Sequence, residues 1–221
     1  MTLKAIIFDM DGVLIHSFEN VKNSLTETIN EDTGIILTKE DYKDTLGRSL
    51  KDMLQIWKKK YPQMPNYVPE ELSKKSGKKE IEILKQQIDN QPNIQKLLEE
   101  ARRQRIKTAV ATSSFHWRTT EILKLLKIEK MFDAIVSIDH ITRGKPFPDS
   151  YLTAAKAIGV PPETCVVIED APKGIQSGKN AGMKVIGVLT PEHTKKELYE
   201  ADIIVKNVEE ITVDIARELF L

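Results

Sequence analysis

Residues 3–12 read LKAIIFDMDG, and this stretch decides the fold. Its apolar part, AIIF, is short and uninterrupted, which is typical of a strand buried in a sheet. Two acids follow it, Asp9 and Asp11, and carboxylates about 4 Å apart repel by roughly 4 kcal/mol at an effective dielectric near 20. We therefore expect a metal ion or a lysine beside them. Gly12 supports this interpretation, because a residue without a Cβ lets the chain turn sharply and lets a ligand approach. The alternative is an Asp-rich surface turn.

Short apolar runs recur after this strand, and most are followed by a helical pattern. They lie at residues 5–8, 108–111, 134–138, 165–168, 185–189 and 203–205. Alternation of this kind predicts a doubly wound α/β fold, in which a parallel sheet carries helices on both faces.

The pattern breaks between the first two runs. Residues 16–89 are nearly all helical in character, with Val21, Leu25 and Ile29 at helical spacing. Because this segment is too long for one crossover, we expect an inserted helical domain at 16–89, with Trp57 in its core. The remaining residues, 1–15 and 90–221, would form a Rossmann-like core.

The composition excludes several classes of protein. Lysine plus arginine and aspartate plus glutamate are balanced at 33 each among 221 residues, so no overall field attracts nucleic acid or an anionic membrane. The single cysteine, Cys165, has no partner for a disulfide, which favours a reducing cytoplasm. No apolar run approaches about 18 residues, so we expect neither a membrane span nor a signal peptide. The sequence does not determine the oligomeric state, and a monomer is the simpler expectation.

Three further groups of polar residues follow predicted strands, at the edge where open α/β sheets bind ligands. The first is Thr112-Ser113-Ser114, whose hydroxyls could meet an anion or cap a helix. The second is Lys145, held between Gly144 and Pro146, although a loop lysine is usually only solvated. The third is Glu169-Asp170, a second acid pair. Two acid pairs at strand ends of one sheet can converge on a divalent cation, and oxygen ligands favour Mg²⁺.

The order of these motifs, Asp-x-Asp-Gly, Thr-Ser-Ser, Gly-Lys-Pro and Glu-Asp, resembles the haloacid dehalogenase superfamily of phosphotransferases. The resemblance spans the whole chain. The position of the helical insertion, directly after the first motif, is similar to the subgroup with a helical cap, which includes β-phosphoglucomutase and phosphoglycolate phosphatase. It implies an enzyme that acts on a small phosphorylated metabolite.

The resemblance implies a catalytic role for four residues. Asp9 would be the nucleophile that becomes an aspartyl phosphate. Asp11 would protonate the leaving oxygen and then deprotonate the attacking water. Thr112 would hydrogen-bond a phosphoryl oxygen, and Lys145 would neutralise the nucleophile and the transferring group.

The same resemblance implies a Mg²⁺ site. Asp9 and Asp170 would hold the ion through their side chains, and the backbone carbonyl of Asp11 would add a ligand. Glu169 would lie close to the metal or contact the residues that bind it.

Substrate contacts are implied for Ser113 and Ser114 in the core and for Gly47 and Arg48 in the loop Leu46-Gly47-Arg48-Ser49-Leu50 of the insertion. His116 follows Ser114 closely enough to face substrate, although a helix-cap or surface role is the alternative. Relatives close the cap over the substrate, so we expect a hinge near Ile15 to Ser17 and near Asp89 to Pro92.

Two residues depart from the family pattern. His16 stands where relatives commonly carry Asp, so the family's contacts at this position of the hinge do not carry over to this chain. Val21 stands where the mutases carry a histidine on their first cap helix. We interpret His140 and His193 as surface loop residues.

A Mg²⁺-dependent phosphatase is therefore the leading hypothesis, and a sugar phosphomutase that uses the same core residues is the alternative. A dehalogenase is disfavoured because those relatives need no metal and lack the second acid, here Asp11. A phospho-receiver is disfavoured because receivers carry the phosphorylated Asp after a central strand and lack an insertion of this size. A silent binding protein is disfavoured because every core catalytic position is filled.

Overall fold

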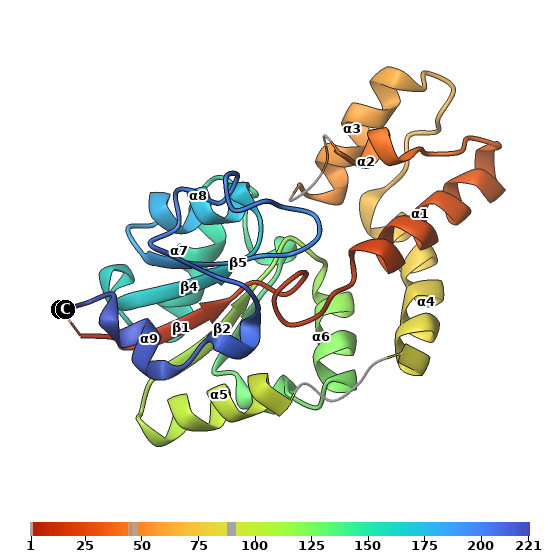
Figure 1. The fold of residues 1–221 in the computed structure, drawn as a ribbon. Helices are drawn as coiled ribbons and strands as arrows, with labels where there is room; N and C mark the ends of the chain where they lie inside the picture. Colours follow the sequence, from red (N-terminus) through yellow and green to blue (C-terminus); the bar gives the residue numbers. More distant parts are fainter. Residues whose placement is uncertain (1, 44, 46–47, 88–91) are drawn as a thin grey trace.

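The computed structural model describes residues 2–43, 45, 48–87 and 92–221. Within them, six parallel strands form one sheet in the order β3-β2-β1-β4-β5-β6 (Figure 1). The strands are β1 (Ala5–Phe8), β2 (Lys107–Ala111), β3 (Ala134–Val136), β4 (Cys165–Glu169), β5 (Lys184–Val188) and β6 (Ile203–Val205). The strand that opens the chain thus lies in the middle of the sheet, between β2 and β4.

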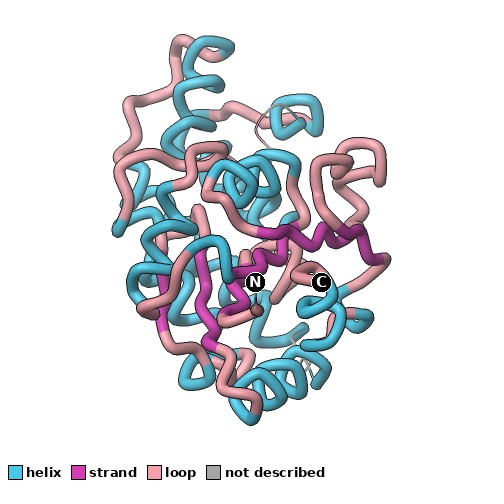
Figure 2. The backbone as a smooth tube through the Cα atoms, turned by 90° about the vertical axis from the view of Figure 1, so that its left-hand side faces the viewer, coloured by secondary structure: helices cyan, strands magenta, loops and turns pink. Residues whose placement is uncertain are grey.

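Helices cover both faces of the sheet, so the predicted doubly wound α/β fold is confirmed (Figures 1 and 2). On one face, α5 (Pro92–Arg103), α6 (His116–Leu125) and α9 (Val213–Glu218) pack against Ile6 and Phe8 of β1. On the other, α7 (Asp149–Ala157) and α8 (Pro172–Asn180) pack against Ala5 and Ile7. Successive side chains of a strand point to opposite faces, and both faces are buried here, which is why β1 reads as an unbroken apolar run.

One predicted strand is shorter than expected. The apolar run at residues 134–138 forms a strand only to Val136, because the next residues begin a 3₁₀ helix, η2 (Ile138–His140). Ser137 and His140 cap each other's backbone in this turn, which ends the strand pairing. The other short helices are η1 (Glu129–Met131), η3 (Pro162–Thr164) and η4 (Val208–Glu210).

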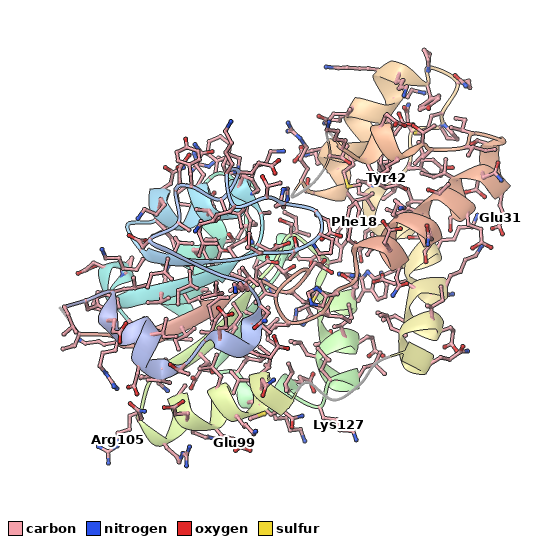
Figure 3. The ribbon with its side chains drawn as sticks, viewed as in Figure 1. Phe18, Glu31, Tyr42, Glu99, Arg105 and Lys127 are labelled. Atoms are coloured by element: carbon pink, nitrogen blue, oxygen red, sulfur yellow. The ribbon has the colours of Figure 1, made fainter. Side chains whose placement is uncertain are left out.

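Between β1 and α5, the described residues form four helices, which lie to the right of the sheet in Figure 1. They are α1 (Phe18–Thr33), α2 (Lys39–Lys43), α3 (Leu50–Lys60) and α4 (Pro69–Gln87). They share a hydrophobic core of their own, in which Trp57 is 1% exposed, as expected. The Trp57 indole N–H donates to the carbonyl of Asp41 over 2.9 Å, and its ring meets Tyr42 edge-on. Tyr42 in turn meets Phe18 at the start of α1 (Figure 3).

Helix α4 belongs to both hydrophobic cores. Leu72, near its start, packs in the core of the helical segment, whereas Ile81 and Leu84 pack with α5, α6 and the sheet. Gly77, between them, lies so close to α6 that a Cβ there would be 2.2 Å from the ring of Trp117. The helical segment is therefore seated on the sheet domain through α4 and α6. We expect the second hinge near Asp89 to Pro92, and of this stretch residues 89–91 lie outside the described residues.

None of the helices in the described part of the chain combines the length and the apolar character that a membrane span requires.

Candidate active site

A buried lysine and three carboxylates meet at the carboxyl edge of the sheet. The Lys145 ammonium donates to Asp9 over 2.5 Å and to Glu169 over 2.6 Å. The ligand oxygens of Asp9, Glu169 and Asp170 lie within 4.8 Å of one another. We call these four residues the Lys145 cluster. The structure thus brings together the first acid pair, the second acid pair and the loop lysine.

The pairing of β1 with β4 builds this cluster. Phe8 lies opposite Ile168, so Asp9 and Glu169 follow at the same level of neighbouring strands, and the Asp9 N–H donates to the Ile168 carbonyl. Glu169 is fixed further by the Tyr151 hydroxyl of α7, which donates to it over 3.0 Å. Its other oxygen accepts from the N–H groups of Asp170 and Ala171. The carboxylates are therefore held in place before any ligand arrives.

Burial sets the protonation of these acids. Desolvation raises the pKa of Asp9 to about 7, against the opposing charge of Lys145 and with a further increase from Glu169. Desolvation, together with the charges of Glu169 and Asp9, also raises the pKa of Asp170 well above its usual range. A metal ion binds carboxylates in their ionised form, and with all three ionised the cluster, including the Lys145 ammonium, carries a net formal charge of −2. The cluster is thus short of positive charge by the amount that one divalent cation carries.

The surroundings of the acids fit a hard divalent cation. The donor set consists of carboxylate oxygens, which Mg²⁺ prefers. Two glycines let backbone lie directly against the acids. A Cβ on Gly12, where φ is +90°, would be 2.1 Å from Asp170, and one on Gly174 would be 1.6 Å from Glu169. The chain could not fold this closely around the carboxylates with larger residues at these positions.

Asp11, the second acid of the opening motif, lies in a different environment. Its carboxylate accepts hydrogen bonds from Arg118 at both oxygens, over 2.7 and 2.9 Å, and from the hydroxyls of Ser114 and Ser17. Burial alone would raise the pKa of Asp11, but the charge of Arg118 and these hydrogen bonds outweigh it and lower the pKa. Asp9 and Asp11 thus share one turn and differ in their partners.

A cavity of about 470 Å³ lies over both acids, between the sheet edge and the helical segment. Thr112, Ser113 and Ser114 line it from the core, as expected. Thr112 is 1% exposed, and its hydroxyl oxygen accepts from the N–H of Ser114 over 3.1 Å. Arg48 lines the cavity from the insertion, and Gly47 lies outside the described residues.

Two histidines, His116 and His193, lie in places that differ from our expectation. His116 does not line the cavity: it is exposed, its backbone N–H donates to Asp139, and its ring packs on His140. His193, expected at the surface, does line the cavity and is half-buried, because the chain folds back at Thr190 after β5. Burial lowers the pKa of His193. His16 also lines the cavity, as does Val21.

Four polar residues of the site escape a sequence analysis: Ser17, Glu80, Arg118 and Tyr151. Two of them carried a signal. Arg118 lies four residues after Ser114, in the first turn of the helix that follows the Thr112-Ser113-Ser114 motif, where a side chain can reach back to the motif. Glu80 interrupts the buried stripe of α4 that contains Leu72, Ser76 and Leu84, and an acid on such a stripe indicates a buried partner.

Comparisons with known proteins agree with the motifs. Residues 6–188 match the family model "Haloacid dehalogenase-like hydrolase". The chain is 28% identical to the phosphorylated carbohydrates phosphatase of Thermotoga maritima, over 98% of this chain and all of that protein. It is 30% identical to the beta-phosphoglucomutase of Bacillus subtilis, over 98% of this chain and 95% of that protein.

A solved structure shares the whole fold. It is beta-phosphoglucomutase from Clostridium difficile, with a TM-score of 0.83, 22% identity and coverage of 98% of this chain and 96% of that one. At this identity the likeness shows the fold alone. The family model and the two relatives show more: the chain belongs to the haloacid dehalogenase-like hydrolases and is a phosphohydrolase of that family.

Proposed function

We propose that this enzyme hydrolyses the phosphate monoester of a small metabolite, with Asp9 as the nucleophile and Mg²⁺ as the cofactor. The observation that carries the proposal is the Lys145 cluster, in which a buried carboxylate with a paired lysine faces the cavity beside two further acids. A carboxylate can attack a phosphate dianion only where positive charge offsets their repulsion.

Each step of the reaction uses a residue with suitable contacts. Asp9 attacks phosphorus, and the phosphoryl group becomes bonded to its carboxylate oxygen. Lys145 offsets the charge of Asp9 and of the transferring group. Because the N–H of Ser114 donates to the Thr112 oxygen, the Thr112 hydroxyl proton is directed elsewhere and can meet a phosphoryl oxygen.

The second half of the reaction uses Asp11. Asp11, protonated when the ester is bound, gives this proton to the leaving oxygen as the ester P–O bond breaks, and it later accepts a proton from the water that hydrolyses the aspartyl phosphate. A divalent cation held by Asp9, Asp170 and Glu169 would supply further neutralisation of the phosphoryl oxygens when bound.

The cavity and the relatives support a class of substrate. A cavity of about 470 Å³ accommodates a small metabolite. One relative is named a phosphorylated carbohydrates phosphatase and others hexitol phosphatases, so phosphorylated sugars and sugar alcohols are the first candidates.

We assign the helical segment, residues 16–89, to a cap that contributes Arg48 to substrate binding, with the core formed by 1–15 and 90–221. The support is its separate hydrophobic core and its position over the cavity. Closure of such a cap would exclude water from the site.

A panel of phosphorylated metabolites tests the function. Release of inorganic phosphate is measured with Mg²⁺ and with excess chelator, for the wild type and for Asp9→Asn. We expect turnover of at least one sugar phosphate, dependent on Mg²⁺ and absent in the variant. Turnover that persists in chelator or in Asp9→Asn contradicts the assignment.

A phosphomutase is the second candidate, because a beta-phosphoglucomutase is 30% identical to the chain. Val21, at the position of the mutases' cap histidine, lines the cavity and can neither donate nor accept a proton. We therefore expect water to intercept the aspartyl phosphate. The test supplies β-glucose 1-phosphate with a catalytic amount of glucose bisphosphate and follows glucose 6-phosphate and inorganic phosphate together. Efficient glucose 6-phosphate formation with negligible phosphate release favours the mutase.

A further inference from the structure

Arg118 links Asp11 to the helical segment. Its guanidinium lies between the Asp11 carboxylate, in the turn after β1, and the carboxylate of Glu80, on α4. Arg118 and Glu80 are 5% and 2% exposed, whereas the side chain of Asp11 is 34% exposed. Asp11 is thus the end of the chain of contacts that meets solvent in the cavity, and the other two form its support.

Every donor of Arg118 is used. A guanidinium has five N–H groups in a planar fork. The Nε donates to Glu80 over 2.8 Å, Nη1 donates to Asp11 over 2.9 Å and to Ser114 over 2.7 Å, and Nη2 donates to Asp11 over 2.7 Å and to Glu80 over 2.6 Å. Five acceptors for five donors leave the guanidinium one orientation, and this orientation fixes the plane of the Asp11 carboxylate.

Glu80 reaches Arg118 because α4 lies close to α6. Gly77, one turn before Glu80, has no side chain between its helix and the ring of Trp117, where a Cβ would be only 2.2 Å away. Trp117 precedes Arg118 on α6. The same close contact between helices therefore brings the two charged side chains within hydrogen-bond distance.

We propose that Arg118 and Glu80 are positioning residues for Asp11: Arg118 aims the carboxylate at the leaving-group side of the cavity, and Glu80 holds Arg118 from the insertion. The inference rests on the proposed function, in which Asp11 is the acid and base. Neither residue touches the reacting atoms, since both act through Asp11. The placement of the acid then depends on the seating of α4.

The leaving group of the substrate distinguishes positioning from a structural role. Proton donation matters for a poor leaving group such as phenolate and much less for 4-nitrophenolate. Both esters have the same shape around phosphorus, so they share binding and nucleophilic attack. We therefore compare kcat/KM for phenyl phosphate and 4-nitrophenyl phosphate, each with Mg²⁺, in the full-length protein.

In Arg118→Met we expect kcat/KM to fall about 100-fold for phenyl phosphate and less than about 5-fold for 4-nitrophenyl phosphate. Glu80→Gln is expected to change the ratio of the two kcat/KM values, 4-nitrophenyl phosphate over phenyl phosphate, about 10-fold. Arg118→Lys keeps the charge but not the planar fork, so its ratio should stay close to that of Arg118→Met. In the double variant, Glu80→Gln should add nothing to Arg118→Met, because Glu80 acts only through Arg118.

Two matched controls use exposed charges on the same helices. Lys124→Met on α6 breaks an exposed pair with Glu121, and Glu82→Gln on α4 breaks an exposed pair with Lys85. Both should leave kcat/KM for the two esters unchanged. If Arg118→Met does not fold, Glu80→Gln, which keeps the shape of the side chain and its carbonyl acceptor, carries the test.

The outcomes separate the inference from the proposed function. An equal loss for both esters, or a gain, overturns the positioning role even though the phosphatase stands. Turnover by the wild type that survives Asp9→Asn overturns the proposed function, and the positioning role falls with it. A ratio that changes in both Arg118→Met and Glu80→Gln while the controls stay fixed supports the inference.

Discussion

Two cations serve the opening motif, and they are built into the molecule in different ways. Lys145 meets Asp9 and Glu169 entirely within the sheet domain. Arg118 meets Asp11 in the sheet domain and Glu80 in the helical segment. Lys145 therefore keeps both contacts wherever the helical segment lies. Arg118 keeps both contacts only while the helical segment packs on the sheet domain.

This difference suggests a division of labour. The residues proposed to attack phosphorus and hold the cation follow directly after strands, which position side chains more precisely than loops do. The residue proposed to move protons is fixed partly by α4, which belongs to both hydrophobic cores. Proton transfer would therefore respond to the helical segment, and nucleophilic attack would not.

Asp9→Asn gives the largest expected effect. The amide cannot attack phosphorus as a carboxylate does, so kcat should fall by more than about 10⁴-fold for every ester. Phosphate release from 4-nitrophenyl phosphate measures it. Asp214→Asn, an exposed acid paired with Arg217, is the control and should retain full activity. Residual turnover near the wild-type level would place the nucleophile elsewhere.

Lys145→Met should reduce activity about 100- to 1,000-fold, and equally for good and poor leaving groups. It also leaves the carboxylates of Asp9 and Glu169 buried without their cation, which costs about 3 kcal/mol of unfolding free energy. Kinetics with the two aryl esters and urea unfolding in chelator measure these losses. A loss confined to phenyl phosphate would erase the contrast between Lys145 and Arg118.

The sequence predicts the role of Lys145 and does not predict that of Arg118, although Lys145 is the farther of the two from its partner along the chain. Lys145 and Asp9 are separated by 136 residues, and Arg118 and Glu80 by 38. Lys145 is predictable because parallel strands place their carboxyl ends at one edge, so residues after different strands meet whatever lies between them.

Arg118 and Glu80 meet only because α4 packs on α6 at a particular height and rotation. That packing depends on Gly77 and Trp117, whose contact no helical periodicity reveals. The same limit applies to His193, which faces the cavity because of a loop fold, and to His116, whose exposed position follows from the turn before α6. Repeating apolar runs predict the sheet, whereas the packing of one helix on another depends on individual side chains.

Asp170→Asn tests the cation site without relying on turnover. A ligand that binds only the folded state stabilises it by mass action, by about 2.7 kcal/mol at 100 times its Kd. We expect Mg²⁺ to raise the Tm of the wild type and to have a much smaller effect on Asp170→Asn. Thermal unfolding with Mg²⁺ and with chelator measures this. An equal shift in both proteins would mean that the ion binds away from the Lys145 cluster.

Gly77→Ala perturbs the seating of α4 directly. The added methyl would overlap the Trp117 ring, so the helices must separate slightly, at a cost of about 1–3 kcal/mol. If Asp11 depends on this seating, kcat/KM should fall about 10-fold for phenyl phosphate and stay nearly constant for 4-nitrophenyl phosphate. Gly34→Ala, at the exposed end of α1 with nothing within 4 Å of its Cβ, controls for general destabilisation. If the ratio of kcat/KM for the two esters were equal in Gly77→Ala and Gly34→Ala, the packing of α4 would have no specific effect on Asp11.

Arg48→Ala tests the contribution of the insertion to substrate binding, because Arg48 lines the cavity from the insertion. Its guanidinium would favour an anionic substrate by charge, so its loss should lower kcat/KM about 10-fold, mainly through KM, for both esters. The Tm should be unchanged, since the side chain is exposed. Lys51→Ala, an exposed cation in the first turn of α3, separates this local effect from a change in the overall field. The contrary outcome is that Arg48→Ala changes the ratio of kcat/KM between phenyl and 4-nitrophenyl phosphate. The insertion would then affect proton transfer through Arg48 as well as through Glu80, and Arg118 would not be the only cation that links the insertion to Asp11.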